Sequence, residues 1–444
     1  MNPLLKIDLD RVFFNCRELK RITKSILKDK DINLYYAIKA NYNKMVRNLI
    51  LDEGYGAEIL SEYELDLIKP DIPVLINGHV KSDIFLEKAL NRSNVQIIVE
   101  SINEIENICK IYETKKLNKI IDIGIRIPFI RSRIGFNINE INILNEINDK
   151  YKFLNIDMLH FHAGWNNTDN SIYEEQLKLI FDIHNLLKNN GIKITKWNIG
   201  GSYCEYSSDK SQLHTRIKLL KSIIPNEVGK VYLEPGRFLV GDAGTLYSAV
   251  VNINDSECTI NSATYGYLLS GATPSIYYVD RENNSMKIDI EENSKFKLCG
   301  IWPSDNDCIH MKEININMGD TIVFRNMGAY LDDSMKNISF DFNFDYKVIK
   351  KVYPLFKIAS DEEKVVLLKF WDFNNRIFKK IPKSQGMLMS IISLILRIVI
   401  TEKKYTEIEL NKLLSDYFED FATIRREMVE KKLLYKVGDS YERK

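Results

Sequence analysis

Cysteine pairs of the kind that bind zinc or build a disulfide framework are absent from this 444-residue chain. None of its six cysteines belongs to a C-x-x-C motif, and they are scattered along the whole sequence. They are Cys16, Cys109, Cys204, Cys258, Cys299 and Cys308. This spacing argues against a disulfide-rich scaffold and a zinc site, and it predicts free thiols in a reducing cytoplasm.

Strong net charge is also lacking. The chain has 62 Lys and Arg against 61 Asp and Glu, which gives a formal net charge of +1. A chain with this balance has no bulk electrostatic attraction to nucleic acid or to an anionic membrane. Its apolar fraction of 45% and its charged fraction of 28% are those of an ordinary soluble protein.

Long hydrophobic runs are missing too. The longest, residues 387–400, is too short to cross a bilayer and contains Arg397, so it predicts a buried helix. The first eight residues do not have the pattern of a signal peptide. Together these absences predict a cytoplasmic protein without a membrane partner.

Short β-rich runs alternate with helical patterns from residue 33 to about residue 240. The eight candidate strands are residues 34–38, 57–60, 74–77, 95–99, 122–127, 158–162, 197–199 and 231–233. Eight strands in βα alternation indicate a closed (β/α)8 barrel of the α/β class more than an open sheet. Catalytic residues of such barrels lie where the strands end, as Lys39, His162 and Glu234 do.

The predicted secondary structure changes twice after the barrel. Strand-like segments at 248–260, 286–290, 296–300 and 321–324 have turn-rich joins and few helices between them. Residues 361–435 are mostly helical, with a capping box at Thr406–Glu409. We therefore expect a barrel over 30–242, a β-sandwich or barrel-like domain from 1–29 and 243–348, and a small helical domain over 349–444.

Lys39 is the first candidate for chemistry, because an apolar strand ends in this single amine. A lysine at a strand end commonly extends its amine into solvent. The alternative is a desolvated amine that forms a Schiff base. The second interpretation gains support from later segments, which supply a flat ring, a phosphate cradle and a carboxylate.

His160 and His162 are two residues apart and point to the same side of a strand. No third metal ligand is nearby in the sequence, so a flat imidazole against a planar cofactor is favoured and no metal site is expected. Gly200 and Gly201 follow another strand, where backbone N–H groups can approach a phosphate. Taken alone, two glycines more often indicate a tight turn.

Glu234 and Arg237, in the motif EPGR, follow the last candidate strand. The arginine can close on a phosphate dianion. The glutamate can pair with a pyridine nitrogen and keep it protonated, which favours loss of an α-carboxylate as carbon dioxide. An ion pair between these two residues at the rim of the barrel is the simpler alternative.

Ordered motifs over residues 4–348 resemble the fold-type III decarboxylases that use pyridoxal phosphate (PLP). These motifs are YAIKAN (36–41), GAEILSEYEL (56–65), NGHVKS (77–82), IVES (98–101), RIP (126–128), SRIG (132–135), HFHAG (160–164), NIGGS (198–202), EPGR (234–237) and GAY (328–330). The family includes ornithine, arginine and diaminopimelate decarboxylases and is typically a head-to-tail dimer with shared active sites.

The resemblance assigns roles to individual residues. Lys39 would be the Schiff-base lysine, Glu58 the acid beside it, His162 the group stacked on the ring, and Glu234 the partner of the pyridine nitrogen. The residues that would hold the phosphate region are Gly200, Gly201, Ser202, Gly236, Arg237 and Tyr330. The substrate is then an amino acid or a carrier-bound aminoacyl group.

Several positions depart from the family pattern. Trp165 replaces a serine, and Ser202 replaces the third glycine of the phosphate loop. The family stretch G-P-x-C-[DE]-x-x-D is GIWPSDND here, so Pro303 replaces the proton-donating cysteine and Ser304 the substrate-binding acid, while the final Asp307 is kept. The sequence TPSIY at 273–277 lacks the arginine that binds a distal carboxylate in diaminopimelate decarboxylases. Ser304 and Asp307 remain candidate catalytic residues.

The C-terminal segment resembles a small winged-helix-like domain of unknown function. Arg425 and Arg426 suit a recognition helix, but a solvated face with a packing role is the stronger interpretation, so no nucleic-acid partner is expected. The sequence thus predicts a dimeric PLP-dependent amino-acid decarboxylase of a specialised pathway. Two alternatives stay open: a PLP enzyme with another outcome, such as decarboxylative deamination or racemisation, and a decayed decarboxylase that acts as a regulator.

Overall fold

The computed structural model describes residues 2–129, 134–164, 168–264, 275–302, 304–331, 345–373 and 375–443. The chain forms two compact units. The first contains residues 1–7 and 15–347, and the second contains residues 8–14 and 348–444. The two units are described separately below.

A closed barrel of eight parallel strands forms the larger part of the first unit. Its strands are β2 (Asp31–Ala37), β3 (Gly56–Ile59), β4 (Val74–Ile76), β5 (Val95–Val99), β6 (Ile121–Arg126), β7 (Leu154–His160), β8 (Lys196–Asn198) and β9 (Lys230–Leu233). The barrel closes because β9 pairs with β2, with Leu34 opposite Leu233. All eight strands lie within a few residues of their predicted positions, so the predicted fold class is confirmed.

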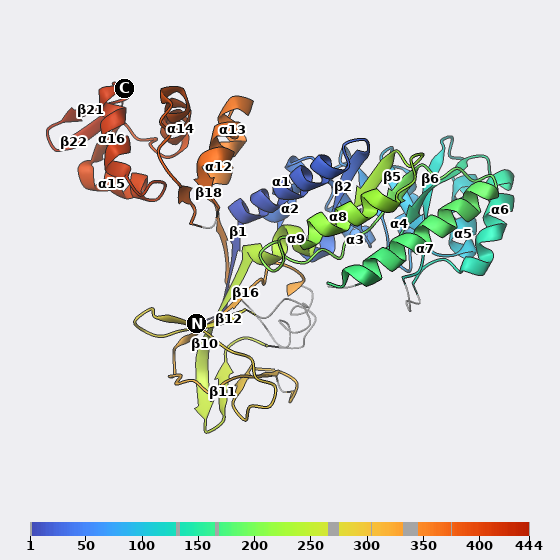
Figure 1. The fold of residues 1–444 in the computed structure, drawn as a ribbon, viewed down its shortest axis with the longest axis horizontal. Coiled ribbons are helices and arrows are strands. Elements are labelled where there is room, and N and C mark those ends of the chain that lie inside the picture. The colour runs from blue at the N-terminus through green and yellow to red at the C-terminus, as the bar shows by residue number, and fades with distance from the viewer. Residues whose placement is uncertain are drawn as a thin grey trace. The chain divides into compact units, whose positions relative to one another are not determined.

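Helices follow the strands and surround them, as Figure 1 shows. They are α2 (Lys44–Asp52), α3 (Glu62–Asp66), α4 (Asp83–Leu90), α5 (Ile102–Thr114), α6 (Leu144–Lys150), α7 (Asn170–Asn189) and α8 (Gln212–Ile223). Polar side chains fix where several of them begin: Ser82 accepts a hydrogen bond from the backbone of Phe85, and Ser101 accepts one from Glu104.

The interior of the barrel is a packed core. Leu75, Ile98, Met158 and Tyr232 form a buried cluster there, with Tyr35 packed against it. A core of this kind leaves no pore, so a ligand can bind only at an end of the barrel.

A nine-stranded sheet completes the first unit. Its central order is β13-β12-β16-β10-β11-β14-β15, and β1 pairs with both β10 and β17. The strands are β1 (Leu4–Asp8), β10 (Gly244–Asn254), β11 (Glu257–Ile260), β12 (Ile276–Val279), β13 (Ser285–Lys287), β14 (Lys297–Cys299), β15 (Cys308–His310), β16 (Thr321–Arg325) and β17 (Asp345–Ile349). The single strand expected over 248–260 is in fact the antiparallel pair β10 and β11, because the polar residues 255 and 256 form a turn.

Helix α1 (Leu9–Ile26) begins in the second unit, which also contains the helical C-terminal segment. The elements of that segment are α12 (Val352–Ile358), α13 (Asp361–Phe370), β18 (Trp371–Asp372), β19 (Ile377–Phe378), α14 (Gln385–Ile398), β20 (Lys404–Thr406), α15 (Glu407–Ser415), α16 (Phe421–Glu430), β21 (Leu434–Val437) and β22 (Ser440–Arg443). The predicted buried helix is α14, and the predicted capping box of Thr406 and Glu409 is formed at the start of α15.

Arg425 is held within the C-terminal segment. Its guanidinium forms an ion pair of 2.7 Å with Glu407 and a hydrogen bond with Asn411, both on α15. These bonds tie α16 to α15. None of the helices in the described part of the chain combines the length and the apolar character that a membrane crossing requires.

Candidate active site

Lys39 lies at the carboxyl end of the barrel, in a 3-10 turn, Ile38–Ala40, that directly follows β2. Its Nζ lies 3.0 Å and 2.8 Å from the two carboxylate oxygens of Glu58, at the end of β3. Glu58 is only 1% exposed. The amine is therefore anchored by a buried base and does not simply extend into solvent.

The charges of this pair stabilise each other. Burial lowers the pKa of the Lys39 ammonium, but the Glu58 carboxylate, with Tyr330 and Glu234, outweighs it and holds that pKa above its usual value. Burial raises the pKa of Glu58. A lysine amine acts as a nucleophile only when neutral, and Glu58 is the buried base in contact with it.

Glu234 directly follows β9 and is 5% exposed. Its Oε1 accepts hydrogen bonds from the side-chain amides of Asn77 (3.0 Å) and Asn198 (2.6 Å). Burial raises the pKa of this carboxyl group, but His160 at 3.5 Å, Lys39 and Asn198 outweigh it, and the pKa ends below its usual value. A charged carboxylate therefore stands at the floor of the site.

His162 is held as a neutral ring. Its Nδ1 accepts a hydrogen bond from the backbone N–H of Gly201 (3.3 Å), so the neutral ring carries its proton on Nε2, 3.4 Å from the Ser202 hydroxyl. The Ser202 hydroxyl in turn donates to the carbonyl of Gly164. Burial lowers the pKa of His162 to about 3. A neutral, oriented imidazole can lie against a planar cofactor without repelling a positive ring.

Glycine residues line one end of the site. Gly200 has φ +62°, and a Cβ there would lie 2.5 Å from the carbonyl oxygen of Phe161. A Cβ on Gly236 would lie 2.8 Å from the Tyr330 hydroxyl. Ser202, where the family has glycine, keeps the left-handed conformation with φ +69°. Its hydrogen bonds offset a strain of about 1–2 kcal/mol.

Arg237 stands beside this glycine-lined end and is 4% exposed. Its Nη1 donates to the buried Glu205 at 2.9 Å, and its guanidinium lies 5.2 Å from the centre of the Tyr330 ring. Gly241 leaves room for this pair, because a Cβ there would lie 2.5 Å from Cγ of Glu205. The arginine is thus fixed in place before any anion arrives.

These groups line one cavity at the carboxyl end of the barrel. Its lining contains nine of the predicted site residues: Lys39, Glu58, His162, Gly201, Ser202, Glu234, Gly236, Arg237 and Tyr330. Gly200 shapes the turn that leads into this lining. An amine, a charged carboxylate, a neutral ring and a cradle that a Cβ would fill, beside an arginine, fit PLP. Among the described residues, no group of three or more His, Cys, Asp or Glu could hold a metal.

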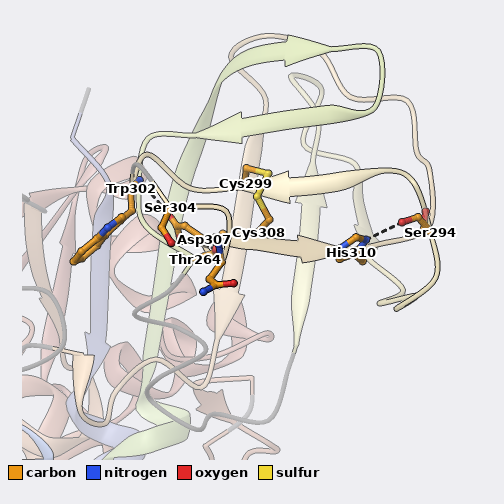
Figure 2. Close-up of a disulfide and its surroundings, with 9 residues drawn as sticks. Thr264, Ser294, Cys299, Trp302, Ser304, Asp307, Cys308 and His310 are labelled. Carbon is orange, nitrogen blue, oxygen red and sulfur yellow. Dashed lines mark hydrogen bonds between the residues drawn. A yellow bond between two sulfur atoms is a disulfide. The ribbon is translucent and has the colours of Figure 1, made fainter.

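Ser304 and Asp307 lie apart from this cavity lining, in the loop that joins β14 to β15 (Figure 2). Asp307 is fully buried and accepts hydrogen bonds from the Thr264 hydroxyl (2.7 Å) and the Trp302 backbone (2.9 Å). Gly300 is required there, because a Cβ would lie 2.1 Å from the carboxylate of Asp307. Asp307 shapes the loop in this chain, and Ser304 lies on the same loop.

Trp165, Pro303 and Thr273 lie outside the described residues.

The prediction that all cysteines are free thiols is wrong for two of them. Cys299 and Cys308 form a disulfide across β14 and β15, at the base of the loop (Figure 2). Antiparallel pairing places the two residues directly opposite each other. The sequence analysis did not anticipate this pairing because β15 was not among the predicted strands. The other four cysteines are buried and free.

The disulfide predicts how many cysteines react with iodoacetamide. In denatured, unreduced protein four cysteines should be alkylated, and in reduced protein all six should be. Mass spectrometry of the peptides should assign the reductant-dependent label to Cys299 and Cys308. A Cys299→Ser variant serves as the control, because it leaves Cys308 labelled without reductant. Full labelling before reduction would contradict the bridge.

The neutral His162 predicts an acid-sensitive apoprotein. Its pKa of about 3 lies below the value of about 6.5 that an unfolded chain has, so between these pH values the unfolded state binds more protons. Stability should fall as pH decreases through that window, by up to about 1.4 kcal/mol per pH unit from this group. Urea unfolding of the apoprotein and of His162→Gln at several pH values measures it. Equal slopes for both proteins would contradict the burial of a neutral ring.

Four polar residues of the site were not predicted individually from the sequence. Asn77, Arg126 and Asn198 lie at or just after the ends of β4, β6 and β8, so their strand-end positions were an available signal. Arg126 forms an ion pair of 3.0 Å with Glu100 beside the cavity. Glu205 lies in an irregular segment, and nothing in its sequence neighbourhood marks it.

Two family models match this chain. The family model described as the pyridoxal-dependent decarboxylase, pyridoxal binding domain matches residues 16–241. A second family model, described as an uncharacterized protein conserved in bacteria, matches residues 377–443.

Individual relatives agree with the family match. Diaminopimelate decarboxylase of Aquifex aeolicus is 30% identical over 51% of this chain and 58% of the relative. A 2-[(L-alanin-3-ylcarbamoyl)methyl]-2-hydroxybutanedioate decarboxylase of Staphylococcus aureus is 25% identical over 70% of this chain and 86% of the relative. The structure of diaminopimelate decarboxylase from Helicobacter pylori complexed with L-lysine shares the fold, with a TM-score of 0.66, 20% identity, and coverage of 79% of this chain and 92% of that one. This chain belongs to the pyridoxal-dependent decarboxylase family, and it is a carboxy-lyase that uses PLP.

Proposed function

We propose that this enzyme holds PLP as a Schiff base on Lys39 and decarboxylates an amino acid or an aminoacyl conjugate. The observation that carries the proposal is the convergence of Lys39, Glu234, His162 and Arg237 on one cavity. Glu58 would take the proton that the Lys39 amine must lose. Arg237 and the glycine-lined turn would hold the phosphate of the cofactor.

When bound, PLP accepts the electron pair that remains when the carboxylate leaves the α-carbon. Glu234 would keep the pyridine nitrogen protonated, because it is a charged, buried carboxylate held by Asn77 and Asn198. An unprotonated nitrogen would suit racemisation better. The charge of Glu234 therefore supports decarboxylation over racemisation, and the complete set of cavity residues argues against a decayed enzyme.

Two departures in the sequence support an unusual substrate. TPSIY at 273–277 lacks the arginine that meets a distal carboxylate in diaminopimelate decarboxylases, and Ser304 stands where the family has a substrate-binding acid. Diaminopimelate therefore lacks the arginine expected for its distal carboxylate, and the usual substrate-binding acid of the loop is replaced by a hydroxyl. The relative from Staphylococcus aureus carries the name of a conjugate decarboxylase, which favours a conjugated amino acid here.

Return of a proton to the product requires a donor. Pro303 has no proton to give, and Cys299 and Cys308 are bridged, so neither carries a thiol proton in this state. The hydroxyl of Ser304 is our candidate on this loop. Product analysis in deuterated water tests this part of the proposal. In a Ser304→Ala variant, part of the proton should go to the cofactor carbon in place of the product carbon, and water would then release the aldehyde. Some deuterated amine should therefore be replaced by aldehyde with an equal amount of pyridoxamine phosphate, and unchanged product would exclude Ser304.

The substrate class is tested by incubating the protein with PLP and a panel of free amino acids and citryl or acyl conjugates of diamino acids. Release of carbon dioxide and the product masses are measured together. Activity on conjugates above that on ornithine and diaminopimelate is expected. Carbon dioxide release from neither class would contradict the proposed function.

We also propose a homodimer in which the loop between β14 and β15 completes the partner's site. Ser304 and Asp307 lie outside the cavity lining of their own chain, although the family pattern places this loop at an active site. Mixing Lys39→Ala protein with Ser304→Ala protein should restore about a quarter of the wild-type sites by random exchange of subunits. No recovery beyond that of the separate variants, or a monomer by light scattering, would contradict the dimer.

A further inference from the structure

Two buried asparagines join the three parts of the cofactor site. Asn77 is 4% exposed and Asn198 is fully buried. They come from different strand ends, after β4 and at the end of β8, and their amide nitrogens meet at the same oxygen, Oε1 of Glu234. Among the described residues, no hydrogen bond is made to the other oxygen, Oε2, so the carboxylate is held on one side only.

Each asparagine also contacts a second part of the site. The Asn77 amide nitrogen lies 3.1 Å from Oε1 of Glu58, which binds the Lys39 amine. The Asn198 side-chain oxygen accepts the backbone N–H of Gly200 at 3.0 Å, and Gly200 opens the glycine-lined turn. A continuous hydrogen-bonded path therefore runs from the lysine through the ring-nitrogen acid to the phosphate end.

We infer that Asn77 and Asn198 are positioning residues that fix the Glu234 carboxylate at a set distance from Lys39 and from the phosphate turn. This inference rests on the proposed Schiff base at Lys39. Both residues are neutral donors, so they stabilise the charged carboxylate and leave its charge in place. A lysine or an arginine would neutralise that charge. A buried donor pair on one oxygen also leaves Oε2 to face the pyridine nitrogen.

Asn198 allows the two contacts to be separated. In Asn198→Asp, a carboxylate oxygen still accepts the N–H of Gly200, but the donor to Glu234 is lost and two carboxylates meet in a buried place. One of them should then hold a proton at neutral pH. In Asn198→Leu, which has a similar volume, both contacts are lost.

The test measures PLP itself, not turnover. The dissociation constant of PLP is determined by fluorescence quenching, and the absorption band of bound PLP is titrated from pH 5 to pH 9. Asn198→Asp should bind PLP within about threefold of wild type, yet its titration midpoint should shift by at least one pH unit. Asn198→Leu should lose at least tenfold in PLP affinity, which is about 1.4 kcal/mol.

Asn155→Leu is the matched control. Asn155 lies near the amino end of β7, whereas the site lies at the carboxyl ends of the strands, and its side chain donates to Asp122. It should change neither reading. Equal PLP affinity and equal titration for wild type, Asn198→Asp and Asn198→Leu would overturn the inference, as would identical losses for the two Asn198 variants. Circular dichroism identifies unfolded variants, and Asn77→Leu then provides the second test, with the same shift of the titration midpoint expected. Wild-type protein that does not bind PLP would refute the proposed function instead.

Discussion

Lys39→Ala protein should be unable to hold PLP covalently and should lose activity by at least about 10³-fold, while the phosphate end of the site still binds the cofactor. The reason is that Lys39 is the amine at the centre of the cavity, in contact with Glu58 at 2.8 Å. Dialysis followed by absorbance should show PLP lost from the variant and kept by the natural protein.

Folding must be controlled in this experiment. Removing Lys39 leaves Glu58 buried without its cation, which costs about 3–5 kcal/mol for a buried pair. The double variant Lys39→Ala with Glu58→Gln removes the orphaned charge and should recover stability but not activity. Retained covalent PLP in either variant would contradict the role of Lys39.

Glu234→Gln should lower kcat by about 10²–10⁴-fold with little change in stability or in PLP affinity. The glutamine oxygen can still accept hydrogen bonds from Asn77 and Asn198. Its amide nitrogen would then face the pyridine nitrogen as a donor, so that nitrogen would stay unprotonated. The expected loss is therefore electronic and not structural.

Steady-state kinetics and thermal unfolding together test this prediction. Glu234→Asp is the conservative comparison, because it keeps the charge but withdraws it from the ring. It should retain more activity than Glu234→Gln. Near-normal kcat in Glu234→Gln, in a folded protein, would show that the carboxylate does not control the ring nitrogen.

The barrel was predictable because its strands are short apolar runs that end in distinctive residues. Val95–Val99 was placed without error, since both ends are bounded by polar residues. In the β domain the signal was weaker. Strand β15 (Cys308–His310) has three residues and only one buried apolar side chain, so no periodicity marks it, and the disulfide at its start was missed with it.

The cavity residues were predictable where their chemistry is rare. A lysine, a histidine and the EPGR motif at strand ends attract attention from sequence alone. Asn77 and Asn198 do not, because asparagine after a strand is also the usual residue of a turn. Glu205 pairs with Arg237 only through the folded chain, 32 residues apart. Such partners follow from packing and not from local pattern.

Sodium borohydride reduction of the protein with PLP, followed by peptide mapping, tests the central claim most directly. Reduction converts a Schiff base into a stable secondary amine, so the modified lysine survives digestion. The account predicts a single phosphopyridoxyl group on the peptide that contains Lys39, and none in the Lys39→Ala variant. A label on another lysine, or no label on a folded protein, would contradict it.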